Sequence, residues 1–162
     1  MPFRYAYPLD QLVRAFKYHG ILSYGRVLGS LLADRLAARA GPGPQLIVPV
    51  PLHPSRHRDR GFNQAEELAR PISRRLDIAI ADRLCRRVRA TADQTELDAR
   101  MRRRNVRHAF EVTGRLNLPH VAVLDDVLTT GSTANELARV LKRAGARTVE
   151  IWAVARAQAA NT

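Results

Sequence analysis

The sequence predicts an α/β fold in which a mostly parallel central sheet is flanked by helices. Short apolar runs that are typical of buried strands alternate along the chain with longer amphipathic segments that are typical of helices. Glycine and proline separate these segments at several of the expected boundaries. The length of 162 residues favours one domain, and a hydrophobic content of 46% is sufficient for a substantial core.

Two amphipathic helices are expected in the N-terminal part of the chain. Residues 9–19 carry apolar side chains at helical spacing, and residues 24–40 repeat that pattern. The sequence GPGP that follows ends the second helix, because glycine and proline interrupt helices. We therefore expect residues 1–44 to form a helical appendage to an α/β core of residues 45–162, within a single domain.

The remainder of the chain predicts strands and helices in alternation. Residues 51–62 are polar, basic and broken by proline, so we expect a loop there. Asn63 and Thr133 each precede a glutamate by three residues, a capping pattern that predicts helices from Asn63 to Leu76 and from Thr133 to Gly145. The expected strands are residues 46–50, 78–84, 109–112, 121–126 and 148–156.

The composition indicates which kinds of binding partner and which cellular location to expect. The net charge is +12, and nearly all of the cationic side chains are arginines, since Lys17 and Lys142 are the only lysines. Arginine binds phosphate through a planar fork, so the charge favours anionic partners, although an arginine-rich solvated surface explains it equally well. Cys85 is the only cysteine, which excludes an internal disulfide and a cysteine-cluster metal site. With no signal peptide and no apolar run of roughly 18 to 20 residues, we expect a cytoplasmic protein without membrane insertion.

The stretch VAVLDDVLTTGST, residues 121–133, indicates a ligand site. Asp125 and Asp126 come at the expected end of a strand, where ligands bind in open α/β sheets. The hydroxyl-rich bend after them leads into a helix N-terminus, which favours anions, and its glycine permits a close backbone approach. The expected phosphate-binding residues are Thr129, Thr130, Gly131, Ser132 and Thr133.

The two acids must face something other than the phosphate, because like charges repel. Carboxylates accept hydrogen bonds from a vicinal diol and favour a cation such as Mg²⁺. A ribose 5-phosphate with free hydroxyls meets both demands, so we expect Asp125 and Asp126 to bind the sugar and to hold Mg²⁺ directly or indirectly. The alternative is that the acids cap a loop and the bend begins a helix. The stretch lacks the spacing of a Walker A loop.

This stretch resembles the phosphoribosyl pyrophosphate (PRPP) signature of the type I phosphoribosyltransferases. The resemblance implies the type I fold with a helical hood, supplied here by the N-terminal helices. It implies that Asp125 and Asp126 hold the ribose hydroxyls and that residues 129–133 hold the 5-phosphate. The expected catalytic residues are then these two acids and Arg60, an arginine of the basic segment that follows the first core strand.

PRPP, the phosphoribosyl donor, also carries a pyrophosphate, which requires a basic group at the end of a neighbouring strand. The segment PLHPSRHRDRGF follows the first core strand and carries three arginines. We expect Arg56 and Arg60 to bind pyrophosphate, with Gly61 allowing a close approach. His53 or His57 is an alternative ligand, although a histidine in a loop is more often exposed to solvent.

A third basic segment, residues 86–105, occupies the place of the mobile loop that closes over the site in type I enzymes. Closure would exclude water and prevent hydrolysis of the donor. Arg89, Thr91 and Gln94 are the residues expected to act from this loop. The alternative is an exposed arginine-rich helix.

Taken together, these motifs resemble the ComF family of phosphoribosyltransferase-like proteins, including its GntX-type members. The elements RGFNQ and RATADQTELDARMRRRNVRHAF carry most of the likeness, which extends over residues 8–156. Members often have an N-terminal cysteine-bearing zinc segment, which is not seen in this sequence.

The resemblance implies two functions of different classes. The first is transfer of a phosphoribosyl group from PRPP to a nitrogenous base, in DNA uptake or nucleotide salvage. The second is a non-catalytic role in DNA uptake, in which the chain binds single-stranded DNA or a competence helicase and the site serves as a sensor. Aromatic residues are only 6% of the chain, so platforms for base stacking are scarce. A homodimer is compatible with either function.

Overall fold

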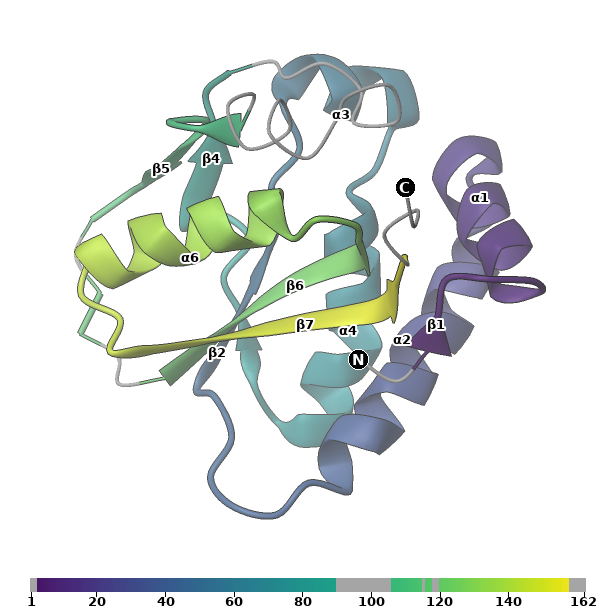
Figure 1. Cartoon of the computed structure of the whole chain (residues 1–162), viewed down its shortest axis with the longest axis horizontal. Helices are drawn as coiled ribbons and strands as arrows, with labels where there is room; N and C mark the ends of the chain where they lie inside the picture. The colour runs from purple at the N-terminus through teal and green to yellow at the C-terminus, as the bar shows by residue number, and fades with distance from the viewer. Residues whose placement is uncertain (1–2, 90–105, 115, 118–119, 158–162) are drawn as a thin grey trace.

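A computed structural model of the chain describes residues 3–89, 106–114, 116–117 and 120–157 (Figure 1). The described strands are β1 (Phe3–Arg4), β2 (Leu46–Pro49), β3 (Ala79–Ile80), β4 (Cys85–Arg87), β5 (Phe110–Val112), β6 (His120–Leu128) and β7 (Thr148–Arg156). The described helices are α1 (Leu9–His19), α2 (Leu22–Ala37), α3 (Pro54–Arg60), α4 (Gln64–Leu76) and α6 (Ser132–Arg143). In these ranges no helix combines the length and apolar character needed to cross a membrane.

The central sheet has five strands in the order β1-β7-β6-β2-β3, and all of its neighbours are parallel. A separate antiparallel pair, β4 and β5, lies beside it. The predicted α/β class with a mostly parallel sheet is therefore confirmed. The carboxyl ends of the parallel strands β2 and β6 lie side by side, which is where the sequence predicts the ligand site.

Helices cover both faces of the sheet, because side chains of a strand alternate between its faces. On β6, Val121 and Val123 belong to the apolar cluster that includes Leu137 of α6. Ala122 and Leu124 belong to the opposite cluster, which α1, α2 and α4 complete. Figure 1 shows the two layers, with α6 in front of the sheet and with α4 and α2 behind it.

Several predicted elements are confirmed within one or two residues. The helix predicted over 9–19 is α1, the helix expected to begin after Asn63 is α4, and the strand predicted over 148–156 is β7. The Asn63 cap is present, since its side chain accepts a hydrogen bond from the Ala65 N–H at 3.0 Å.

The loop predicted over 51–62 is wrong in part, because it contains α3. Pro54 stands in the first turn, where its missing N–H costs nothing, and the His53 side chain caps that turn by accepting from the Ser55 N–H at 3.3 Å. The helix ends at Gly61, whose φ of 74° is left-handed. Proline therefore begins a helix here instead of preventing one.

The predicted end of the acidic strand is also wrong. β6 continues past both aspartates to Leu128, because β7 remains paired with it there, whereas the pairing with β2 ends at Leu124. The following helix begins at Ser132 with Gly131 as its cap, one residue before the predicted start at Thr133. Thr133 is therefore the second residue of the helix and not its N-cap, and Glu136 accepts hydrogen bonds from Arg139 and from the His108 N–H.

Two further differences concern the ends of the sheet. The strand predicted over 78–84 is reduced to the short β3, and the chain then leaves the sheet to form β4. Strand β1 was not predicted from the sequence; it pairs with the carboxyl end of β7 and connects to α1. This connection brings α1 to the carboxyl end of the sheet, near Asp125 and Asp126.

Candidate functional site

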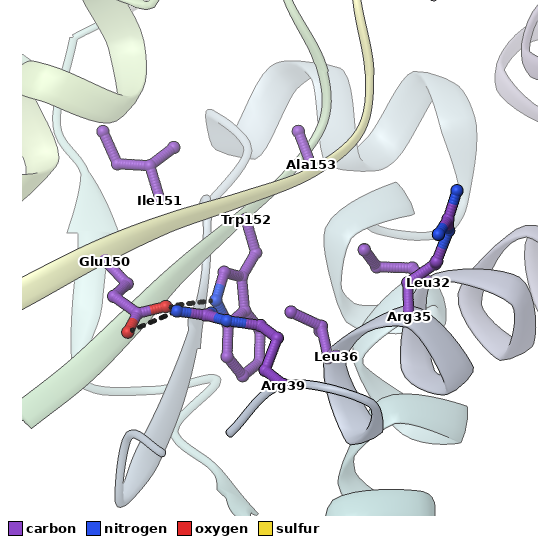
Figure 2. Close-up of a pocket in the computed structure, with 8 residues that line it drawn as sticks. All are labelled: Leu32, Arg35, Leu36, Arg39, Glu150, Ile151, Trp152 and Ala153. Atoms are coloured by element: carbon purple, nitrogen blue, oxygen red, sulfur yellow. Dashed lines mark hydrogen bonds and ion pairs between the residues drawn. The ribbon is translucent and has the colours of Figure 1, made fainter. Parts of the chain in front are cut away.

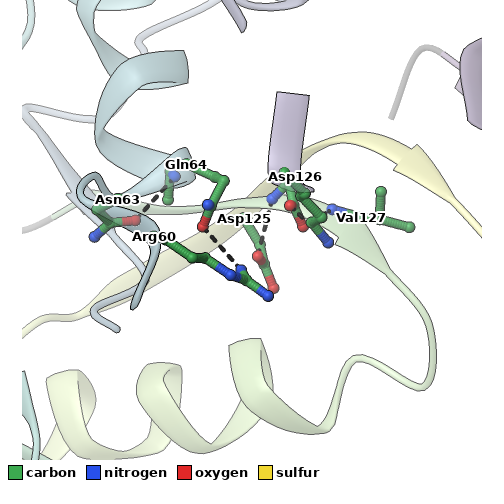
Figure 3. Close-up of polar contacts among 8 residues, drawn as sticks. Arg60, Asn63, Gln64, Asp125, Asp126 and Val127 are labelled. Carbon is green, nitrogen blue, oxygen red and sulfur yellow. Dashed lines mark hydrogen bonds and ion pairs between the residues drawn. The ribbon is translucent and has the colours of Figure 1, made fainter. Parts of the chain in front are cut away.

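Asp125 and Asp126 lie where β6 extends beyond its neighbour β2. By strand alternation, Asp125 projects to the face covered by α6 and Asp126 to the face covered by α1. Asp125 Oδ1 accepts a hydrogen bond from the Asp126 N–H at 2.9 Å, and Asp126 Oδ1 accepts one from the Val127 N–H at 2.6 Å. Both acids therefore lie on the part of β6 that is no longer paired with β2 (Figure 3).

Asp126 is paired with Lys17 of α1. The Lys17 Nζ lies 2.7 Å from Asp126 Oδ2, and the carboxylate side chain is only 9% exposed. Burial lowers the pKa of the Lys17 ammonium, but the charge and hydrogen bond of Asp126, together with the Asp125 charge, outweigh burial, so that pKa lies above its ordinary value. Lys17 therefore stays charged at neutral pH.

Asp125 is in a different electrostatic environment. Burial, and secondly the neighbouring Asp126 charge, raise its pKa to about 7. The surroundings thus disfavour the charged form of Asp125. A cation bound beside it would favour the carboxylate.

The hydroxyl-rich bend forms a small open cradle at the start of α6. The Thr130 and Ser132 hydroxyls are hydrogen-bonded at 2.7 Å, and the Gly131 φ of 71° makes the turn into the helix possible. Thr129 and Thr130 are exposed, and Thr133 is half-buried. Thr130 and Ser132 line a cleft of about 420 Å³ with residues of α6 and of 106–108. The bend is therefore accessible to a ligand.

The basic segment reaches the site from α3. Arg60 Nη1 donates to Gln64 Oε1 at 3.2 Å, and its guanidinium lies over the Tyr18 ring at 5.4 Å. In Figure 3, the side chains of Arg60 and Asp125 point toward each other from α3 and β6. Gly61 has open space around it, which permits the close approach expected of it.

A further arginine, Arg87 of β4, lies beneath this segment. It is 8% exposed, and its guanidinium lies over the Phe110 ring at 5.5 Å. Burial, and secondly the nearby Arg56 charge, lower the pKa of Arg87 to about 10, although the Asp125 charge acts in the opposite direction. These couplings place Arg56, Arg87 and Asp125 within electrostatic reach of one another.

A larger cleft, of about 670 Å³, lies between α2 and β7 (Figure 2). Arg39 Nη1 forms an ion pair with Glu150 Oε2 at 2.6 Å, and the Trp152 indole donates to the same oxygen at 2.9 Å. None of the predicted site residues lines this cleft. The groups of Arg39 and Glu150 satisfy each other, so we assign the chemistry to the acidic edge of the sheet.

The chain has relatives of similar sequence, although no family model matches it. The DNA utilization protein YhgH of Salmonella typhimurium is 43% identical over 160 residues, covering 94% of this chain and 69% of the relative. Competence protein F of Haemophilus influenzae is 39% identical over 160 residues, covering 94% of this chain and 70% of the relative. The chain belongs to the ComF family.

The fold of this ComF-family chain is similar to that of a solved phosphoribosyl pyrophosphate enzyme. The structure of glutamine PRPP amidotransferase from B. subtilis, complexed with ADP and GMP, matches with a TM-score of 0.50 and 18% sequence identity. The match covers 80% of this chain and 26% of that chain. The likeness concerns the fold alone, and the predicted type I phosphoribosyltransferase fold is confirmed.

Not all residues predicted for the ComF-family site can be placed. The acids, the hydroxyl-rich bend and the arginines of α3 gather at one edge of the sheet. Arg89 is exposed, and its Nη1 donates to the Arg107 backbone oxygen at 3.1 Å, next to the smaller cleft. Thr91 and Gln94 lie outside the described residues.

Sequence reasoning did not single out Lys17, Tyr18, Gln64 or Arg87 as site residues. Gln64 is 3% exposed, and its Nε2 atom has no hydrogen-bond partner among the described residues. In β4, Cys85 and Arg87 are buried and Arg86 is exposed, but residues 86 and 87 are both arginine, so the sequence does not show which of them faces inward. Lys17 shares helical spacing with Val13, which indicates the inward face of the helix, but the sequence does not indicate its partner Asp126.

Mg²⁺ fits this ComF-family site only in a limited way. The described residues contain no group of three or more potential metal-binding side chains. Both oxygens of Asp126 already have partners, which leaves Asp125 as the carboxylate with an oxygen to offer. Mg²⁺ commonly binds through one or two carboxylates together with ligand phosphates and water. Among the described residues, the side chains are compatible with that mode and do not form a site that would hold the metal by protein alone.

Proposed function

We propose that the chain binds PRPP together with Mg²⁺ and transfers its phosphoribosyl group to a nitrogenous base. The observation that carries this proposal is the arrangement of two carboxylates between an open hydroxyl-rich bend and an arginine-bearing helix. The bend would hold the 5-phosphate, Asp125 and Asp126 the ribose hydroxyls, and Arg56 and Arg60 the pyrophosphate. A ligand oxygen would also satisfy the buried Gln64 amide.

In this reaction, the bond between C1 and the pyrophosphate oxygen breaks and the acceptor nitrogen forms the new bond to C1. Negative charge grows on the departing pyrophosphate, where Arg56 and Arg60 would stabilise it. The two acids fix the sugar and favour the positive charge that develops on its ring. Mg²⁺, when bound, would neutralise phosphoryl oxygens. The half-site for the acceptor would be formed by the helices of residues 1–44, where the exposed Tyr18 ring is available.

The names of the relatives favour a role in DNA handling. They are described as a DNA utilization protein and as competence protein F, so we propose that this chain acts in the cytoplasm in DNA uptake or nucleotide salvage. The second candidate function is binding of single-stranded DNA or a competence helicase, with the PRPP site acting as a sensor. The net charge of +12 supports this candidate.

The first prediction tests ligand binding by thermal unfolding. PRPP with Mg²⁺, at roughly 100 times its Kd, should raise the Tm by about 5–10 °C, because a ligand that binds only the folded state stabilises it. Asp125→Asn combined with Asp126→Asn should abolish the shift, while Asp34→Asn, an exposed acid on α2, should retain it. An unchanged wild-type Tm at millimolar PRPP would contradict the proposal.

The second prediction separates the two functions. If the chain binds single-stranded DNA, fluorescence anisotropy with a labelled oligonucleotide should give an affinity that falls at least about tenfold between low and physiological salt, because phosphate contacts release counterions. Competition by PRPP would indicate that DNA and donor share the site. Absence of binding at low salt would eliminate the DNA candidate, and pyrophosphate release with a base from a panel would establish catalysis.

A further inference from the structure

Asp126 is not free to receive a sugar hydroxyl on its own. Its Oδ1 accepts the Val127 N–H at 2.6 Å, and its Oδ2 faces the Lys17 ammonium at 2.7 Å. A ligand that contacts this carboxylate must therefore share it with Lys17 or displace Lys17. Any group that approaches Asp126 Oδ2 also comes within reach of the ammonium.

Lys17 is better exposed than the acid to which it is bound. Its side chain is 24% exposed, compared with 9% for Asp126. An ammonium has three N–H donors, and Asp126 uses one of them. Two donors thus remain on a partly exposed ammonium that lies beside the acids, and a ligand oxygen could accept from them.

The position of Lys17 is fixed by its neighbours on α1. Phe16 is fully buried and packs against Phe62, with ring centroids 5.6 Å apart. Tyr18 lies under the guanidinium of Arg60. Consecutive residues of α1 therefore contact the core, the acids of β6 and the arginine of α3. This arrangement holds the ammonium between the two charged halves of the site.

We infer that Lys17 is a ligand-binding residue, whose ammonium neutralises part of the charge of Asp125 and Asp126 and donates hydrogen bonds to the anionic ligand that they hold. The inference rests on the proposed function. Two adjacent carboxylates repel a polyanion such as PRPP. Arg60 points toward Asp125, whereas Lys17 is the cation paired with Asp126. Lys17 supplies a permanent positive charge at that point. Its removal makes binding weaker and more dependent on Mg²⁺.

A purely structural ion pair is the alternative, in which Lys17 only joins α1 to the sheet. The experiment is isothermal titration calorimetry of PRPP against the wild type, Lys17→Met and Lys17→Arg, each with millimolar Mg²⁺ and with a chelator. We expect Lys17→Met to weaken binding at least about tenfold with Mg²⁺, and by a larger factor without it. Lys17→Arg keeps the charge and should lose less affinity in both conditions.

Lys142→Met is the matched control, because it removes the only other lysine of the chain, an exposed residue in the last turn of α6. It should bind PRPP like the wild type. If Lys17→Met is folded and binds PRPP as tightly as the wild type, with the same response to Mg²⁺, the inference is wrong while the proposed function stands. If the wild type itself does not bind PRPP, both fail. A lower Tm of Lys17→Met with unchanged affinity would assign Lys17 the structural role.

Discussion

Replacing Arg60 by alanine is expected to weaken PRPP binding about 30- to 100-fold, while affinity for ribose 5-phosphate changes less than about threefold. The two ligands differ only in the pyrophosphate, which is the group proposed for Arg60. The guanidinium lies between the Gln64 amide and the Tyr18 ring, so it is oriented before the ligand arrives. Calorimetric titration of both ligands measures the difference directly.

Arg58→Ala is the control for this prediction. Arg58 lies on the same short helix and is exposed, whereas Arg60 is half-buried, so both variants lose one positive charge from α3. Arg60→Lys should recover only part of the affinity, because an ammonium cannot reproduce the planar fork of donors. Equal losses for Arg58→Ala and Arg60→Ala would mean that general electrostatic attraction, and not a specific contact, explains the effect.

The elements that the sequence predicted well are those whose signals are local. The β-branched and aromatic run of β7 and the Asn63 cap of α4 are each contained within about ten residues, and the structure confirms both. The acidic edge and the bend could also be located, because they follow one strand in a single stretch. Local pattern was sufficient to propose the ligand class.

The features that sequence analysis missed depend on tertiary structure. The end of β6 is set by β7, which is distant in sequence and keeps the strand paired beyond the acids. The ion pair between Lys17 and Asp126 joins residues that are far apart in the sequence, and it forms because β1 connects α1 to the carboxyl end of the sheet. The helical spacing of Lys17 with Val13 indicates an inward position on α1, but no pattern within α1 indicates which residue of another element Lys17 contacts.

The packing that holds α1 in place leads to the second large prediction, a loss of about 3–5 kcal/mol in the free energy of unfolding for Phe16→Ala. Phe16 is fully buried, and its ring fits against Gly25 of α2, where an added Cβ would lie 2.5 Å from a ring carbon. Urea unfolding followed by circular dichroism measures the loss. Val27→Ala, an exposed position on α2, should change stability by less than about 0.5 kcal/mol.

Gly25→Ala tests whether the contact with Phe16 is the cause. In the wild-type background the added methyl group collides with the ring, and overpacking of this kind costs about 1–3 kcal/mol. In the Phe16→Ala background the collision is gone, and alanine in a helix is favoured over glycine by up to about 1 kcal/mol. The effects of Phe16→Ala and Gly25→Ala on the free energy of unfolding should therefore be strongly non-additive. Gly25→Ala should be neutral or stabilising once the Phe16 ring is absent. Additive effects would contradict the packing.

The same variant connects stability to the site. Because Phe16 precedes Lys17 and Tyr18, loosening α1 removes the ammonium from Asp126 and the ring from Arg60 together. Folded Phe16→Ala should therefore bind PRPP at least as weakly as Lys17→Met, although residue 16 cannot itself contact the ligand from the core. If Phe16→Ala is destabilised but binds with wild-type affinity, α1 is not a wall of the site and the acids act without it.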